Sequence, residues 1–461
     1  MSVVELMKTQ YARFGVMFVS FAGTLILALF SLSSGAWFSD ESYYMVTGQG
    51  YVQFLLKPGR EEFSRFVLSY LHTPTQEAAG LVNHPFFGKL VIGIFLQLSG
   101  FEVPANLCCP PLMPTPTQLF WARLPSTLLA ASTVCVVCYL VFSRFGLTPA
   151  VLAGLYLLSD ATFLQYSRLA MLDIYAATFM IASVALLVLR STPGGKRVYA
   201  SALLAGLMLA SKFTPGVLVT FLFLLGVVLK LKGQRHLIGY LMTSLALFFL
   251  IDFYYFVLPP QYFLNAFFAV NRPILGGVQV SPGPLASFLA MYAWQAFYSI
   301  PHTWSLVEVA LVAFALVVAS FLTIKRVFDG SGFGVLFLAN ATLGFASFSW
   351  ERPLVVLAPV AAIFVSTTIA RFARQYFKNR LIVPIEVAAI AALLVQLGAI
   401  APQAYFSDSP FQYAASTYIP TALRLPTPTY TGDIVLICLG IFAASLAVSL
   451  LRKKADRQHR F

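Results

Sequence analysis

Long apolar stretches separated by short polar segments dominate this chain of 461 residues. Many of the stretches approach the length that an α-helix needs to cross the hydrocarbon core of a bilayer. The strict alternation of apolar and polar residues that marks a membrane barrel is missing. Because a membrane interior offers backbone groups no water to bind, such stretches must be helical. The pattern therefore predicts an all-α polytopic integral membrane protein.

Placed in order, the apolar stretches predict about 12 transmembrane helices, with both termini on the cytoplasmic side. Residues 1–461 are expected to form a single transmembrane domain without a soluble domain. The expected spans are 14–37, 120–142, 147–164, 172–189, 198–211, 214–229, 237–258, 303–324, 333–350, 353–370, 381–400 and 433–451.

Three longer segments are expected on the outer side of the membrane: 38–119, 259–302 and 401–432. Within the first, residues 86–98 are apolar but short, and they are interpreted as a helix lying on or dipping into the outer leaflet. A full span at 86–98 is the alternative, and it would invert the predicted membrane orientation of every later span. The basic loops argue against inversion, because they all fall on one side when 86–98 stays outside.

Composition and charge agree with this class. The chain is 59% hydrophobic and 10% charged, with a mean hydropathy of +0.82, and a soluble fold could not cover that much apolar surface. The net charge of +13 could suggest nucleic acid. Most Lys and Arg residues, however, lie in the loops on the side of the N-terminus, as the positive-inside rule expects. We therefore expect a lipid bilayer and no nucleic acid as partner.

The candidate chemistry lies in charged residues at the outer ends of the predicted spans. Charges at such depths are costly, so they tend to mark function or pairing. A carboxylate can deprotonate an acceptor hydroxyl, and Arg and Lys can bind a phosphate and stabilise its charge as it leaves. No nucleotide-binding Gly loop follows a strand, so the donor is expected to be a lipid phosphate. The residues are Asp40, Glu41, Arg123, Arg168, Asp173, Lys212 and, in the first outer segment, His84 and Lys89.

These residues lie in five short motifs whose order resembles that of the protein O-mannosyltransferases. The resemblance covers residues 35–216 and extends to the neighbouring polyprenyl-phosphate-sugar transferases, which share the multispan GT-C fold. The motifs are Asp40-Glu41, His84-Pro85-x-x-Gly88-Lys89, Arg123-Leu-Pro-Ser126, Ser167-Arg168-x-x-Met-Leu-Asp173 and Ser211-Lys212-Phe213-Thr214.

The resemblance implies an inverting transfer of mannose from dolichyl-phosphate mannose to a protein Ser or Thr on the outer face. By matched position, Asp40 is the catalytic base, with Glu41 beside it. It also implies that Arg123 and Arg168 lie near the lipid phosphate, and that Asp173 orients one of these Arg groups or the sugar. The donor-binding set as a whole is His84, Lys89, Arg123, Arg168, Asp173 and Lys212.

Two departures from the family pattern bear on the prediction. The usual His-Pro-Pro of the family is His84-Pro85-Phe86 here. Residues 259–302 leave no room for the luminal β-trefoil domain of eukaryotic members. A prokaryotic, possibly archaeal, cell membrane is therefore favoured over the endoplasmic reticulum.

Other functions remain open from the residues alone. The acceptor could be a lipid or a glycan, as in the transferases that add aminoarabinose to lipid A. A transporter is the alternative of another class, but it would need polar groups near the bilayer midplane rather than at one edge. No cofactor is expected; a divalent cation on Asp40, Glu41 and Asp173 is not favoured, because hard cations prefer more oxygen ligands. Four further acids, expected in paired or helix-packing roles, are Asp160, Asp252, Glu308 and Glu386.

Overall fold

The structure is a computed structural model of the whole chain, and it describes the greater part of the first 252 residues and several helices beyond them. The described residues are 3–29, 32, 39–59, 85–100, 114–189, 194–212, 215–252, 274–275, 278–279, 304–325, 336–337, 340–341, 352–376 and 382–406. The expected span at 433–451, most of the one at 333–350, and the outer segment 401–432 beyond residue 406 lie outside them.

The described chain is helical apart from one two-residue antiparallel pair of strands. The strands are β1 (Ile274–Leu275) and β2 (Val278–Gln279). The helices are α1 (Val3–Leu29), α2 (Ser39–Leu56), α5 (Phe87–Leu98), α6 (Pro116–Phe145), α7 (Leu147–Ser159), α8 (Ala161–Ser167), α9 (Leu172–Val188), α10 (Gly195–Ser211), α11 (Pro215–Lys232), α12 (Gln234–Ile251), α17 (Leu306–Lys325), α19 (Arg352–Tyr376) and α20 (Ile382–Phe406).

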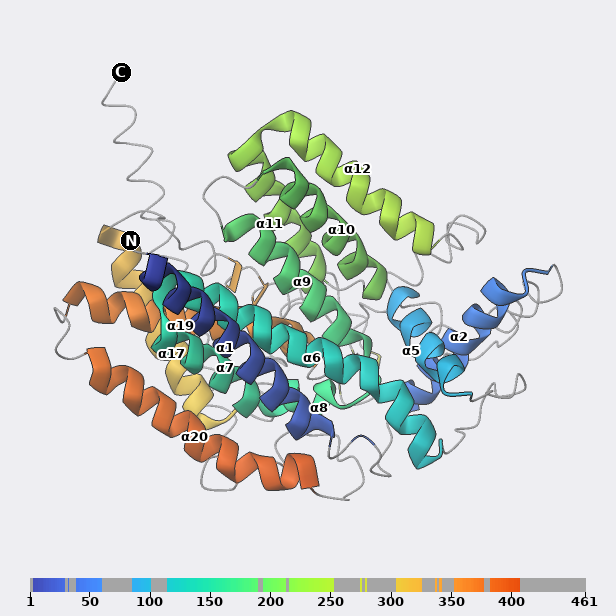
Figure 1. Ribbon diagram of the computed structural model, residues 1–461, viewed down its shortest axis with the longest axis horizontal. Coiled ribbons are helices and arrows are strands. Elements are labelled where there is room, and N and C mark those ends of the chain that lie inside the picture. The colour runs from blue at the N-terminus through green and yellow to red at the C-terminus, as the bar shows by residue number, and fades with distance from the viewer. Residues whose placement is uncertain are drawn as a thin grey trace.

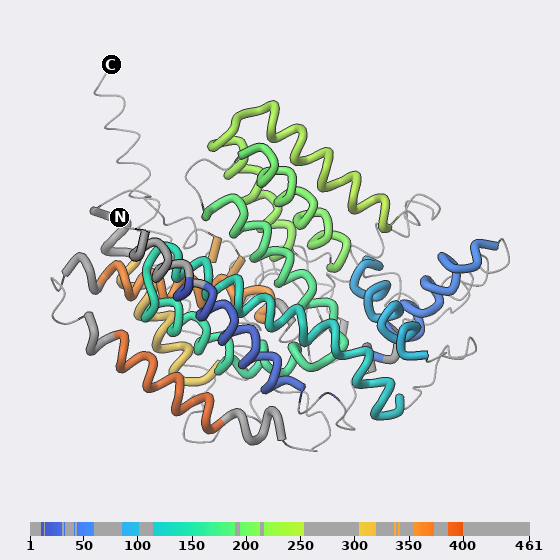
Figure 2. Tube along the Cα trace, viewed as in Figure 1, coloured from blue at the N-terminus to red at the C-terminus, as the bar shows by residue number. Residues whose placement is uncertain are grey.

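The helices gather in three groups. Figure 1 shows α1, α6, α7, α17, α19 and α20 in one bundle, with α10, α11 and α12 in a second group beyond α9. The third group is α2 with α5, which projects from the bundle on the side opposite the N-terminus. The trace in Figure 2 shows α1 lying along α6, so the first helix covers the bundle from outside.

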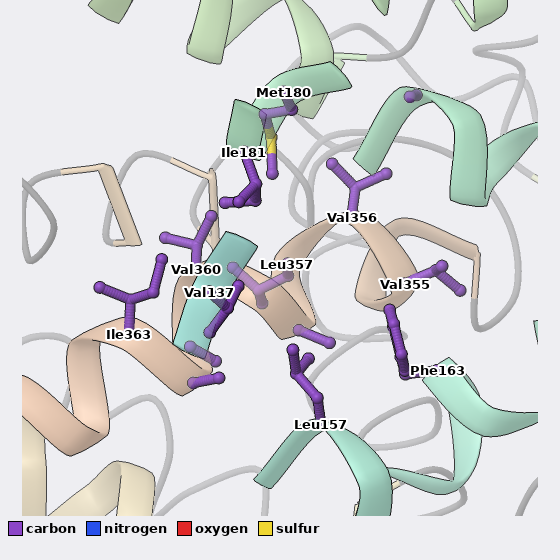
Figure 3. Packing of buried hydrophobic residues seen from close by; sticks show 14 of the residues in the cluster. Val137, Leu157, Phe163, Met180, Ile181, Val355, Val356, Leu357, Val360 and Ile363 are labelled. Atoms are coloured by element: carbon purple, nitrogen blue, oxygen red, sulfur yellow. The ribbon is translucent and has the colours of Figure 1, made fainter. Parts of the chain in front are cut away.

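Helix α19 lies at the centre of the bundle and is buried along nearly its whole apolar length. It packs against α6, α7, α8 and α9, so elements from both halves of the chain share one core. Figure 3 shows Val356 of α19 among Val137, Leu157, Phe163 and Met180, which come from these four helices. By contrast, only 17% of α12 is buried, and it turns apolar side chains such as Ile238 and Met242 outward. An apolar outer surface of this kind suits lipid rather than water.

Local sequence explains where the helices around the site begin and end. A capping box starts α6: Thr115 Oγ1 accepts from the Gln118 N–H at 3.3 Å, and Gln118 Oε1 accepts from the Thr115 N–H at 2.8 Å. Gly146, at φ 94°, separates α6 from α7 in a conformation that favours glycine. The segment predicted as one span over 147–164 is bent by 70° between α7 and α8, at Asp160. Asp160 caps α8, since its Oδ1 accepts from the Phe163 N–H at 2.7 Å.

Three described helices are long and apolar enough to cross a membrane, and the bent pair α7–α8 could supply a fourth. These three contain Pro116–Phe145, Gln234–Ile251 and Leu354–Phe372. The all-helical fold is therefore confirmed, whereas the count of about 12 spans stays a prediction. The segment predicted to lie on the outer leaflet is α5, and its 12 residues would extend about 18 Å, too short to cross.

Close backbone contact joins α2 to α5. Gly48 of α2 and Gly93 of α5 face each other so closely that a Cβ on either would overlap the backbone of the other helix. The two glycines therefore allow a helix pair that larger side chains would force apart. This pair carries two of the five motifs and fixes their relative placement.

Candidate active site

The strongest contact of the site joins α2 to α6. Glu41 and Arg123 form a buried ion pair, in which the Nε and Nη2 groups of Arg123 donate to Oε1 and Oε2 of Glu41 at 2.8 Å each. Arg123 Nη1 also donates to the Leu32 carbonyl at 3.2 Å. Two parallel hydrogen bonds of this kind fix both distance and orientation. Glu41 therefore sets the place of Arg123 and is itself fully engaged.

The same carboxylate also holds the loop between α8 and α9. Oε1 of Glu41 accepts from the Ala170 N–H at 2.7 Å. At the start of this loop, Thr127 of α6 donates to the Ser167 carbonyl at 3.0 Å. Arg168 follows directly and is the C-cap residue of α8. The loop that carries Arg168 is therefore fixed from both α2 and α6.

A second buried ion pair lies at the other end of this loop. Asp173, in the first turn of α9, pairs with Lys212, which follows the last residue of α10. Both side chains are buried. A buried charge is costly without a partner, so each residue stabilises the other in its charged form. The Ser167–Asp173 and Ser211–Thr214 motifs thus meet through this pair.

Lys89 occupies an aromatic environment on α5. Its ammonium nitrogen lies 4.8 Å from the centroid of the Phe86 ring and 5.9 Å from that of the Tyr44 ring, and the side chain is buried. Ring faces attract a cation, so these contacts stabilise the charge. Next to Lys89, Gly88 packs closely on Leu172 at the start of α9. The α5 motif is therefore seated against the helix that bears Asp173.

Two contacts anchor α2 and the start of α5 to the end of α12. The order of the motifs could not predict either contact. Oδ1 of Asp252, the C-cap residue of α12, accepts from the Phe86 N–H at 2.6 Å. The Tyr51 hydroxyl donates to the Ile251 carbonyl at 3.0 Å. Burial, and secondarily the charge of Asp252, raise the pKa of Tyr51 to about 12, so the hydroxyl keeps its proton. In the sequence, Asp252 is an acid at the end of an apolar run. That position was the only feature of the sequence that could have indicated these contacts.

The structure brings together most, but not all, of the predicted site residues. Glu41, Arg123, Arg168, Asp173, Lys212 and Lys89 lie on elements that contact one another around the α8–α9 loop. Of the four cations, Arg168 is the most exposed, at 9%, against 0–2% for the others. Asp40 lies in the first turn of α2, but its side chain is outside what the structure describes, as is the whole of His84.

Within the described part of the chain, no group of three or more His, Cys, Asp or Glu side chains could hold a metal ion. Glu41 and Asp173, two of the three acids considered for a divalent cation, each bind a cationic side chain instead. The divalent-cation alternative would therefore need both acids to exchange partners. This alternative stays a prediction, because the third acid is Asp40, whose side chain lies outside what the structure describes.

Part of the chain that carries the candidate site matches a known family. Residues 69–275 match the family described as dolichyl-phosphate-mannose-protein mannosyltransferase. The matched region holds four of the five motifs, from His84 to Lys212, and begins after Asp40 and Glu41. The resemblance seen in the motifs is thereby confirmed. None of the curated proteins matches the chain.

Two solved structures are similar to the whole fold. Both are crystal structures of ArnT from Cupriavidus metallidurans, one bound to undecaprenyl phosphate and one in the apo state. Each aligns over 94% of this chain and 78% of its own, with a TM-score of 0.50 and 14% sequence identity. At this identity the likeness establishes the fold, which is the GT-C fold of ArnT.

Proposed function

We propose that this GT-C chain, which resembles the dolichyl-phosphate-mannose-protein mannosyltransferases, is a membrane glycosyltransferase that takes its sugar from a polyprenyl phosphate. The sugar proposed is mannose, the donor dolichyl-phosphate mannose, and the acceptor a Ser or Thr hydroxyl of a protein on the outer face. One observation carries the proposal. Glu41 binds both Arg123 and the loop bearing Arg168, so motifs separated by 82 and 129 residues form one unit.

The cations supply what a phosphate leaving group needs. In the transfer, the acceptor oxygen bonds to C1 of the sugar, the C1–O bond to phosphate breaks, and the electron pair stays on the phosphate. Fixed positive groups stabilise that charge without reorganising. Arg123 is held by Glu41, and Lys212 by Asp173. We assign the direct phosphate contact to Arg168 because it is the most exposed of the four cations, at 9%, and we place Lys89 and His84 on the donor side.

The two acids of the first motif are given separate roles. Asp40 is proposed as the base that accepts the proton of the acceptor hydroxyl. Direct attack of that oxygen on C1, from the face opposite the phosphate, makes the transfer inverting. The carboxylate of Glu41 accepts hydrogen bonds from Arg123 and Ala170, so its proposed role is to position them. Asp173 is proposed to hold Lys212 and the first turn of α9 in place beneath the sugar.

A lipid or glycan acceptor is the second candidate, because the fold similarity does not depend on the acceptor. ArnT aligns with 94% of this chain, including its C-terminal half, whereas the mannosyltransferase family model stops at residue 275. Undecaprenyl phosphate is the molecule bound in one ArnT structure. A prokaryotic polyprenyl-phosphate sugar would suit either acceptor.

One experiment separates these candidates. Purified protein in lipid nanodiscs is given radiolabelled dolichyl-phosphate mannose with a Ser/Thr-rich peptide or, separately, with a lipid extract as acceptor. Label in the peptide fraction supports protein mannosylation, and label in a new lipid product separated from the donor supports the second candidate. Unchanged donor with both acceptors, and with other polyprenyl-phosphate sugars, would contradict a transferase. Movement of intact donor across the bilayer of sealed proteoliposomes would then favour the transporter alternative.

A further inference from the structure

The C-cap residue of α12 makes a long-range contact in the candidate site. Asp252 is buried, and its Oδ1 accepts from the Phe86 N–H at 2.6 Å across 166 residues of sequence. Beside it, the Tyr51 hydroxyl binds the Ile251 carbonyl, and the Tyr51 ring meets the Phe86 ring edge-on at a centroid distance of 5.2 Å. The end of α12 therefore binds α2 and the start of α5 together.

The held residue, Phe86, has a ring that faces the ammonium group of Lys89. Phe86 is the N-cap residue of α5 and makes no side-chain capping bond, so its position relies on other contacts. Its ring lies 4.8 Å from the Lys89 ammonium nitrogen. A carboxylate accepts a backbone N–H more strongly than a neutral group would, and it also suits the positive end of a helix. A shift of Phe86 would therefore move the ring beneath the Lys89 charge.

We propose that Asp252 is a positioning residue for donor binding, which fixes the start of α5 and Lys89 by holding the backbone of Phe86. Asp252 does not contact the reacting groups in this assignment. It acts through Phe86 on Lys89, and its catalytic consequence rests on the proposed function. Its structural consequence does not, because the Phe86 N–H is held whether or not the chain transfers a sugar.

The first test compares Asp252→Ala with Asp252→Asn and a matched control. Asn keeps an oxygen that can accept from Phe86, whereas Ala leaves a buried N–H without its partner. The control is Ser244→Ala, which removes a buried bond from Ser244 Oγ to the Ala202 carbonyl, 2.9 Å, on the same helix. We expect Asp252→Ala to raise the KM for the polyprenyl-phosphate sugar about tenfold, with the KM for the acceptor unchanged. Asp252→Asn and Ser244→Ala should stay within about twofold of the natural protein.

The second test measures the contact between Asp252 and Phe86 without an activity assay. Hydrogen–deuterium exchange of the peptide spanning 85–98 should be faster in Asp252→Ala at the start of α5, and unchanged in Asp252→Asn and Ser244→Ala. The proposal is overturned if exchange in Asp252→Ala matches that of Ser244→Ala, or if exchange rises while the donor KM does not. If the natural protein transfers no sugar at all, the proposed function fails, and the exchange result still decides the anchor.

Discussion

Glu41 holds Arg123 through two parallel hydrogen bonds of 2.8 Å, with both side chains almost completely buried. The pair joins the first motif of the chain to the third, and Oε1 of the same carboxylate also accepts from Ala170. Three separate segments thus depend on one carboxylate. Its removal should therefore affect stability and turnover together.

Glu41→Gln should lower the free energy of unfolding by about 3 kcal/mol or more, because it leaves the buried guanidinium without its counter-charge. Turnover should fall as Arg123 and the α8–α9 loop lose their shared anchor. Thermal unfolding in detergent measures the first effect and steady-state transfer the second. The double variant Glu41→Gln/Arg123→Gln, which removes both charges, should recover part of the lost Tm. Natural Tm and turnover in Glu41→Gln would refute this role.

Arg168→Ala should act mainly on donor binding. We expect the donor KM to rise about tenfold or more, because a charge-assisted bond to phosphate is lost. Thermal unfolding is measured alongside, because Arg168 is only 9% exposed and lost stability must be separated from lost donor binding. Arg144→Ala is the control, because Arg144 is an exposed cation at the far end of α6. Equal donor KM values in the two variants would remove Arg168 from the phosphate site.

The Asp173–Lys212 pair predicts a reciprocal rescue. Asp173→Asn leaves a buried ammonium group unpaired and should destabilise the protein by about 3 kcal/mol. Lys212→Met in the same chain removes that charge, so the double variant should unfold at a higher temperature than Asp173→Asn alone. A double variant that adds the two losses instead would show that the residues do not depend on each other.

Asp160 should stabilise α8 and thereby fix the position of Arg168. Asp160→Ala removes the N-cap of the short helix α8 and should cost about 1 kcal/mol, whereas Asp160→Asn keeps a capping oxygen. We expect Asp160→Ala, but not Asp160→Asn, to raise the donor KM, because α8 ends at Arg168. Thermal unfolding and donor titration of the two variants measure this difference. Equal behaviour would mean that the cap does not matter for the site.

The sequence predicted the class of the fold, because apolar stretches of bilayer length indicate helices. The site residues stay a prediction from motif order. The structure joins Glu41 to Arg123 and to Ala170, which lies between Arg168 and Asp173. Periodicity could not predict the 70° bend at Asp160, because the apolar run continues through it. The physical reason for the bend is Asp160, which caps α8 inside this apolar run. A single acid of this kind only weakly indicates a bend in the sequence.

The sequence could not predict which side chains contact each other, and the reason is different. The placement of Arg123 near phosphate stays a prediction. The structure pairs its guanidinium with Glu41, and a charge pattern alone cannot distinguish such an internal contact from a ligand contact. The contact between Asp252 and Phe86 joins residues from different helices and motifs. Such contacts depend on how α12 packs beside α2 and α5, which no local pattern contains.

Single-turnover transfer by Asp40→Asn tests the proposed reaction most directly. The variant is loaded with radiolabelled polyprenyl-phosphate sugar, and sugar transfer to the acceptor is followed alongside donor affinity. Loss of the base should slow transfer by a factor of about a hundred or more while donor affinity stays within about twofold. Transfer at the natural rate would contradict Asp40 as the base.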